Sequence, residues 1–401
     1  MEKLKGKKPS IRFPEFKGEW EKKKLGEVSD NIMYGMNSAA IPFDGENKYL
    51  RITDIDESSR EFNPKPLVSP HGEIEEKYKL KYGDIVFTRT GASVGKTYLY
   101  NPKDGNLLFA GFLIKFSVTK GNPYFIFSQT LKEEYNKWVV KMSMRSGQPG
   151  LNAEECKDLV ISFPTLPEQK KIANFLTAVD EKIQSLKKKK ALLEQYKKGI
   201  MQKIFSQELR FKDDNGKKFP KWEKKKLGEV LEMVVDNRGK TPPVEKGGIP
   251  LLEVNSIGSK DVNYKAVSKF VNQETFKKWF RKYLKPGDVL FSTVGNTALC
   301  SYYDGKYKAV IAQNIVGFRF NEQMGLFMYY LLTEENNYKK MKSIEMGAVQ
   351  PSIKVSQLTE LFFEIPRLLE QTKIANFLSA IDEKINQTET QIQQMQEWKT
   401  G

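Results

Sequence analysis

The chain has 401 residues, of which 39% are hydrophobic and 12% aromatic, so it can bury the cores of two or three globular domains. Its formal net charge of +16 favours polyanionic partners such as nucleic acid, because phosphates neutralised by lysine and arginine release counterions. One histidine, His71, and two cysteines far apart in sequence, Cys156 and Cys300, give no zinc-type spacing and no disulfide framework.

The first residues are rich in lysine and are followed by no apolar segment of the kind that signal peptides contain. The longest apolar run, at residues 107–114, is too short to cross a bilayer. We therefore expect a cytoplasmic protein without a membrane partner.

The chain begins with a mixed segment in which short β-branched runs alternate with turns rich in Gly, Pro, Asn and Asp. GDIVFTRT at residues 83–90 and LLFAGFLIKFSV at 107–118 are predicted strands, and residues 123–142 are predicted to be helical. This combination predicts an α+β domain.

GASVGKT at residues 91–97 resembles a phosphate-binding loop, but its two glycines enclose three residues where a Walker A loop needs four. The sequence that follows does not look helical, and VGNTALCS, the related stretch at 294–301, lacks the lysine. We therefore predict a polar hairpin loop with a recognition role instead of a nucleotide site.

A long helix is predicted next, from Pro167, a favoured first-turn residue, to about residue 206. Its apolar residues alternate spacings of four and three, which is the seam of a coiled coil, although Lys190 and Lys197 interrupt the pattern. The seam residues are Ile172, Leu176, Val179, Ile183, Leu186, Leu193, Ile200 and Ile204.

The rest of the chain repeats this plan. WEKKKLGEV stands at residues 20–28 and again at 222–230, and KIANFL at 171–176 and again at 373–378, both 202 residues apart. A second helix carries a seam in the same phase, formed by Ile374, Leu378, Ile381, Ile385, Thr388, Ile392 and Met395. We expect the two seams to pack together, since a long charged helix needs a partner for its one apolar stripe.

Several separate elements resemble the specificity subunit of type I restriction–modification enzymes, and they recur twice in the same order. They are the module starts at 13–28 and 219–230, the Gly-Asp strands with their loops, and the helix starts LPEQKKIANFL and LLEQTKIANFL. The likeness extends from about Ile11 to Trp398. The second helix ends sooner than the first, by about two turns or more.

The resemblance implies two tandem target-recognition domains of mixed α/β structure, each followed by a long helix. The two helices would form an antiparallel coiled coil with an internal pseudo-twofold repeat. The implied boundaries are 1–166 for the first recognition domain, 167–210 for the central helix, 211–366 for the second recognition domain and 367–401 for the C-terminal helix.

The resemblance also implies a non-catalytic subunit that reads a bipartite sequence in double-stranded DNA through the major groove, with the helices setting the gap. Its implied partners are two modification subunits with adenine methyltransferase activity and two restriction subunits with translocase and nuclease activity. S-adenosylmethionine, ATP and Mg would bind to those partners and not to this chain.

Candidate DNA contacts are polar and basic residues in the loops that differ between the modules, because arginine pairs with guanine and Asn or Gln with adenine. In the first module they are Asn37, Ser38, Arg89, Thr90, Ser93, Lys96, Arg145, Ser146 and Gln148. In the second they are Asn237, Arg238, Lys240, Thr241, Thr293, Asn296, Thr297 and Gln350. Two other functions stay open on the residues alone: a stand-alone nuclease, and a coiled-coil scaffold without DNA specificity.

Overall fold

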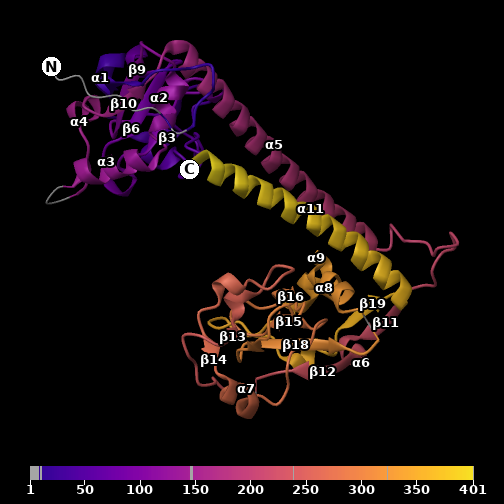
Figure 1. Cartoon of the computed structure of the whole chain (residues 1–401). Helices are drawn as coiled ribbons and strands as arrows, with labels where there is room; N and C mark the ends of the chain where they lie inside the picture. Colours follow the sequence, from indigo (N-terminus) through magenta and orange to yellow (C-terminus); the bar gives the residue numbers. More distant parts are fainter. Residues whose placement is uncertain (1–8, 10, 145–147, 238, 323, 401) are drawn as a thin grey trace. The chain divides into compact units, whose positions relative to one another are not determined.

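The computed structural model describes residues 9, 11–144, 148–237, 239–322 and 324–400 (Figure 1). Residue contacts divide the chain into two compact units, Met1–Ser185 with Gln391–Gly401, and Leu186–Thr390. The boundaries of the units fall inside the two long helices. Each unit therefore contains one mixed domain together with parts of both helices.

The first mixed domain is built on a four-stranded antiparallel sheet in the order β2-β9-β6-β7. Phe87 and Phe116 of the sheet pack edge to face, and Phe125 and Val139 of the flanking helices complete this core. Smaller strand pairs are β1-β10, β3-β5 and the parallel pair β4-β8. The elements are β1 (Glu21–Lys24), α1 (Leu25–Val28), β2 (Ser29–Tyr34), β3 (Ala40–Pro42), β4 (Lys48–Leu50), β5 (Val68–Pro70), β6 (Asp84–Thr88), β7 (Thr97–Leu99), β8 (Leu107–Phe109), β9 (Leu113–Val118), α2 (Pro123–Gln129), α3 (Glu133–Ser143), α4 (Ala153–Lys157) and β10 (Val160–Phe163).

The second mixed domain repeats this arrangement with the sheet β12-β18-β15-β16, the pair β11-β19 and a parallel pair, β13-β17, that β14 extends. Its core joins Phe291 and Phe318 of the sheet to Phe327 of a helix. Helix α7 is an addition that the first domain lacks in its described residues. The elements are β11 (Glu223–Lys226), α6 (Leu227–Val230), β12 (Leu231–Val235), β13 (Ile249–Leu252), β14 (Phe270–Val271), α7 (Gln273–Trp279), β15 (Val289–Ser292), β16 (Cys300–Tyr302), β17 (Val310–Ile311), β18 (Ile315–Phe320), α8 (Gly325–Thr333), α9 (Glu335–Lys342), α10 (Val355–Leu358) and β19 (Phe362–Ile365).

The predicted α+β class is confirmed, but the helix predicted at residues 123–142 is in fact two helices, and the corresponding part of the second domain is divided in the same way. Residues 123–142 form α2 and α3 with a break before Glu133, and residues 325–342 form α8 and α9 with a break at Glu334. The Glu334 side chain accepts hydrogen bonds from two backbone N–H groups of α9, so it caps a new helix and the old one ends.

The segment resembling a phosphate-binding loop connects two antiparallel strands, β6 and β7, through a short 3₁₀ turn at Gly91–Ser93. A Walker A loop continues into a helix, whereas this loop continues into a strand. The hairpin predicted from its spacing is therefore what the structure contains.

Both long helices begin at a buried carboxylate that anchors them to their own mixed domain. Glu168 in the first turn of α5 (Leu166–Phe205) accepts hydrogen bonds from Arg12 Nε at 2.7 Å and Trp20 Nε1 at 3.0 Å. Glu370 in α11 (Leu368–Thr400) accepts from Arg210 Nε at 3.1 Å and Trp222 Nε1 at 3.2 Å. Both glutamates are 1% exposed, so the repeat seen in the sequence is also a repeat of buried ion pairs.

Helices α5 and α11 pack together in opposite directions, and contacts within each unit show the register. In the first unit Lys399 Nζ lies 2.5 Å from Asp180 Oδ1. In the second unit Lys197 Nζ lies 2.6 Å from Asp382 Oδ1, and Lys190 pairs with Glu389. A step of seven residues forward on α5, from 190 to 197, matches a step of seven residues back on α11, from 389 to 382, so the helices are antiparallel.

The predicted seam residues are all buried or partly buried in their own units. Among them, Ile374 and Leu378 are fully buried, and Val179, Ile183 and Leu186 are at most 9% exposed. The interruptions at Lys190 and Lys197 are also explained, because each lysine meets an acidic residue of α11. Within the described part of the chain, no helix combines the length and apolar character needed to cross a membrane.

Candidate nucleic-acid interface

Three loops of the first module that are far apart in sequence are joined by backbone hydrogen bonds. Arg89 N, after β6, donates to Phe112 O in the β8–β9 turn at 3.0 Å. Leu151 N donates to Arg89 O at 2.8 Å, and Gly91 N donates to Pro149 O at 3.3 Å. These bonds bring the predicted residues around Arg89 and the Gln148 loop into one interface.

Arg89 is held in this interface by a neighbouring aromatic ring. Its guanidinium carbon lies 4.7 Å from the centroid of the Tyr34 ring, and the Tyr34 hydroxyl accepts a hydrogen bond from Ala153 N at 3.1 Å. Arg89 Nε is buried and has no hydrogen-bond partner among the described residues. The Tyr34 ring therefore positions the guanidinium of Arg89 through a cation–π contact.

The second module makes the same three backbone connections with different residues. Thr293 N donates to Asn314 O at 2.9 Å, Ile353 N donates to Thr293 O at 2.8 Å, and Gly295 N donates to Pro351 O at 2.8 Å. The two interfaces therefore have a common backbone construction.

The matching positions carry different side chains. Arg89 of the first interface corresponds to Thr293, and Phe112, which is 60% exposed, corresponds to Asn314. Asn314 Oδ1 is buried without a hydrogen-bond partner among the described residues, as Arg89 Nε is. Unsatisfied buried polar atoms are uncommon in folded proteins, and here one occurs in the interface of each module, where the three loops meet.

The predicted DNA contacts fall into four groups. Exposed residues are Asn37, Gln148, Lys240, Thr241, Asn296 and Gln350. Partly buried residues are Ser38, Arg89, Thr90 and Ser93. Buried residues are Lys96, Asn237, Thr293 and Thr297. Arg145, Ser146 and Arg238 lie outside the described residues.

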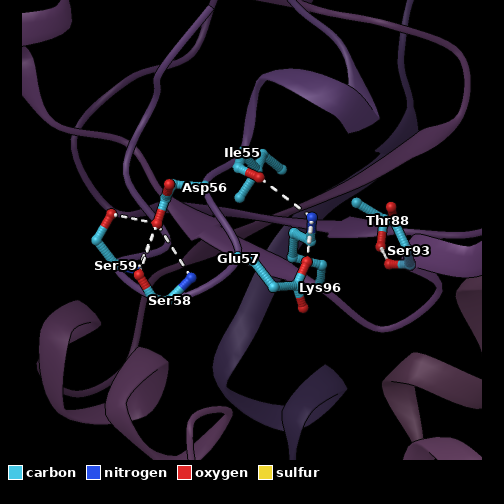
Figure 2. Close-up of polar contacts among 8 residues, drawn as sticks. All are labelled: Ile55, Asp56, Glu57, Ser58, Ser59, Thr88, Ser93 and Lys96. Carbon is cyan, nitrogen blue, oxygen red and sulfur yellow. Dashed lines mark hydrogen bonds and ion pairs between the residues drawn. The ribbon is translucent and has the colours of Figure 1, made fainter. Parts of the chain in front are cut away.

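Lys96 does not present a free ammonium group, because it is engaged inside its own domain (Figure 2). Its Nζ lies 2.6 Å from Glu57 Oε2 and donates to Ile55 O at 3.2 Å. The neighbouring Asp56 accepts hydrogen bonds from Ser58 and Ser59, which hold the same loop in shape (Figure 2). Lys96 thus ties the 55–59 loop to the β6–β7 hairpin.

Asn237 and Thr297 are also engaged within the second module. Asn237 Nδ2 donates to Lys240 O at 3.0 Å and its Oδ1 accepts from Gly239 N at 3.2 Å, so the side chain shapes a turn. Thr297 is fully buried, donates to Glu345 and accepts from Lys342 Nζ at 2.9 Å. Neither side chain is free for a base edge.

Three residues of the two interfaces were absent from the sequence-based candidates: Tyr34, Phe112 and Asn314. Phe112 and Asn314 stand 202 residues apart in corresponding turns between two strands, so a search for unlike residues at matched positions would have found both. Tyr34 has no comparable signal, since its role depends on the folded position of Arg89.

Comparison with known proteins agrees with this two-module construction. Residues 17–195 and 220–397 each match the family described as type I restriction modification DNA specificity domain. The chain is 25% identical to the type I restriction enzyme MjaVIII specificity subunit of Methanocaldococcus jannaschii, over 94% of this chain and 88% of that protein. It is also 25% identical to the putative MjaX specificity subunit of the same organism, over 92% of this chain and 88% of that protein.

Two solved structures have the same fold. One is a chain from a study of complex assembly and conformational transition of the type I R-M system, with TM-score 0.57, 18% identity and coverage of 98% of this chain and 97% of that one. The other is the type I restriction–modification S subunit from M. genitalium, with TM-score 0.57, 15% identity and coverage of 95% and 94%. With both halves matched by the family model, the chain belongs to the type I restriction–modification DNA specificity family.

Proposed function

We propose that each mixed domain reads one half of a bipartite DNA sequence through its interface of three joined loops. The observation that carries this proposal is that the two interfaces share the same three backbone hydrogen bonds but carry different side chains. The first interface has Arg89 and Phe112 where the second has Thr293 and Asn314. A shared scaffold with different polar groups is what two different half-sites require, because base edges in the major groove differ in donors and acceptors. The net charge of +16 supports association with the phosphate backbone.

Arg89 and Asn314 are the proposed base-reading residues. A guanidinium binds guanine O6 and N7 through two hydrogen bonds, and an asparagine amide binds adenine N6 and N7 in the same way. The exposed residues Gln148 and Gln350 stand 202 residues apart, each before a proline, so we assign them a common role on the DNA backbone or in loop shape.

The chain itself is proposed to be non-catalytic. Two modification subunits and two restriction subunits would supply the adenine methyltransferase, the translocase and the nuclease, together with the sites for S-adenosylmethionine, ATP and Mg. The curated relatives described above are specificity subunits of type I restriction enzymes, which supports the assignment of catalysis to other subunits. The antiparallel helices α5 and α11 would set the gap between the half-sites and dock these partners.

Sequencing of methylated adenines in a host that carries the whole system tests the proposal. The expected result is one motif with two short specified halves and an unspecified gap. A continuous motif, or methylation that does not depend on this chain, would contradict it. Metal-dependent cleavage by the isolated chain would indicate a nuclease, and equal salt-dependent affinity for cognate and scrambled duplexes would indicate a scaffold without specificity.

A further inference from the structure

Phe112 is an aromatic side chain that the first interface leaves open to solvent. It is 60% exposed, whereas Ala110 and Leu113 of the same turn are buried. Within the described residues it belongs to none of the hydrophobic clusters of the first domain. An exposed ring of this size gains free energy when an apolar group of a ligand covers it. The ring is therefore available to whatever the interface binds.

The backbone of the turn that carries Phe112 is held by both neighbouring loops. Gly111 N donates to Met36 O in the β2–β3 loop at 2.8 Å, and Met36 N donates to Phe109 O at 2.9 Å. On the other side, Phe112 O accepts from Arg89 N at 3.0 Å. Because these bonds fix the turn before any ligand arrives, little backbone ordering remains to be lost on binding.

The fold does not need an aromatic residue at this turn. In the second module Thr293 N donates to Asn314 O at 2.9 Å, as Arg89 N donates to Phe112 O in the first. The same backbone therefore accepts either phenylalanine or asparagine. What distinguishes the two modules at this position is the chemistry offered to the ligand.

An apolar ring in a DNA-reading interface suits one base in particular. In the major groove thymine presents a methyl group on C5, whereas the other bases present mainly hydrogen-bond donors and acceptors, and phenylalanine is among the side chains that contact this methyl. A donor or acceptor placed against the ring would lose its hydrogen bonds to water without replacement. The ring therefore favours a thymine methyl over the polar edge of another base.

We propose that Phe112 contacts the methyl group of a thymine in the half-site that Arg89 reads. The proposal rests on the proposed function, since it assumes that the first interface faces the major groove. Phe112 would be a specificity-determining residue that selects thymine over cytosine, which has no methyl group on C5. Arg89 would read hydrogen-bonding groups in the same half-site, and the second interface, with Asn314 at this turn, would make no such contact there.

The first test is the methylated motif in hosts that carry the complete system. Arg89→Ala identifies the half-site of the first interface, and we expect that half-site to contain at least one A·T pair. Phe112→Asn introduces the residue that the second module has at this turn, so the fold is expected to persist. It is expected to relax one A·T pair of that half-site and to leave the other half unchanged. A half-site made of G·C pairs alone would contradict the proposal.

The second test removes the methyl group from the DNA. In a synthetic duplex each thymine of that half-site is replaced in turn by uracil, which pairs in the same way but lacks the methyl. At one position the full chain is expected to lose about fourfold in affinity, the value of one buried methyl group. The Phe112→Asn variant is expected to show no loss at that position. No loss at any position, or an equal loss in the variant, would overturn the assignment.

Two control variants show whether the effect belongs to Phe112. Tyr82 is 73% exposed and precedes β6, whereas Arg89 follows that strand, so Tyr82→Ala removes an exposed ring outside the interface. It is expected to keep the full uracil effect. Arg89→Ala is expected to weaken binding and still to keep the uracil effect. Loss of the effect in Tyr82→Ala would mean that it does not depend on contact with Phe112.

A last measurement separates methyl contact from insertion of the ring between base pairs. Insertion unstacks a base step, which raises the fluorescence of 2-aminopurine placed beside the uracil-sensitive position. Unchanged fluorescence is expected, and a rise that Phe112→Asn abolishes would replace methyl contact by insertion. Equal affinity of the full chain for cognate and scrambled duplexes would contradict base reading itself. Specific binding without a uracil effect would contradict only the role of Phe112.

Discussion

Lys197 Nζ lies 2.6 Å from Asp382 Oδ1, so a lysine at a seam position of α5 is neutralised by α11. Asp382 also accepts from the Tyr330 hydroxyl, and burial, followed by this hydrogen bond, raises the pKa of Tyr330. The corresponding residues of the other module form the same ion pair: Lys399 lies 202 residues after Lys197, and Asp180 lies 202 residues before Asp382. The helix pair is therefore held by ion pairs as well as by its apolar seam.

Asp382→Ala is expected to lower the free energy of unfolding of the second unit by about 2 kcal/mol, because it leaves Lys197 and the Tyr330 hydroxyl unpaired in a partly buried place. The matched variant Asp180→Ala is expected to cost about 1 kcal/mol, since the Asp180 side chain is 34% exposed against 11% for Asp382. Urea denaturation of both variants measures the difference. A larger loss for Asp180→Ala would contradict this ranking.

Arg89→Ala and Asn314→Ala are expected to relax one base position each, in different half-sites. A lost bidentate contact reduces discrimination by about 1–3 kcal/mol, and the other half-site provides the control inside the same molecule. Sequencing of methylated positions in hosts that carry each variant measures the effect. Relaxation of the same half-site by both variants would contradict the assignment of one interface to each half.

The sequence predicted the scaffold of this interface better than its chemistry. Identical strings 202 residues apart and a heptad seam are local signals, so the repeat, the hairpins and the long helices could be read from them. The burial of a side chain depends on residues that are distant in sequence, so it could not be predicted from such patterns. Lys96 looks like a phosphate contact until Glu57, which is distant in sequence, is placed beside it.

The helix break at Glu334 has a similar explanation. No Gly or Pro marks the end of the apolar helix at Thr333 and Glu334. Only the hydrogen bonds that the Glu334 side chain accepts from Asn336 N and Asn337 N distinguish a cap from a continuing helix. The unpaired Oε1 atom follows from that conformation, so sequence reasoning had no means of finding it.

Lys96→Met is expected to lower the free energy of unfolding by about 1 kcal/mol, because the hydrogen bond to Ile55 O is lost and the pairing with Glu57 is partly exposed. The methylated motif is expected to stay the same. Calorimetric melting and DNA binding at several salt concentrations separate the two roles. A shallower salt dependence with unchanged stability would instead assign Lys96 to a phosphate.

Cys156 and Cys300 are expected to resist alkylation in the folded protein. Both thiols are buried, and burial raises the pKa of each to about 12, so at pH 8 both remain protonated and unreactive. Mass spectrometry after iodoacetamide treatment should show no addition in buffer and two additions in urea. Labelling of either cysteine in buffer would indicate local opening of α4 or β16.

Lengthening the helix pair by one heptad is expected to widen the gap between the half-sites without changing either half. Seven residues inserted after Lys189 in α5 and seven after Glu389 in α11 keep the Lys190–Glu389 and Lys197–Asp382 pairs on one side and Asp180–Lys399 on the other. A heptad preserves the seam and adds about 10 Å, equal to about three base pairs of duplex at about 3.4 Å each. Methylated-base sequencing reads the new gap directly.

Insertion into α5 alone is the control, since it shifts the two seams against each other and should abolish methylation. An unchanged gap with both helices lengthened would show that something other than this helix pair sets the distance.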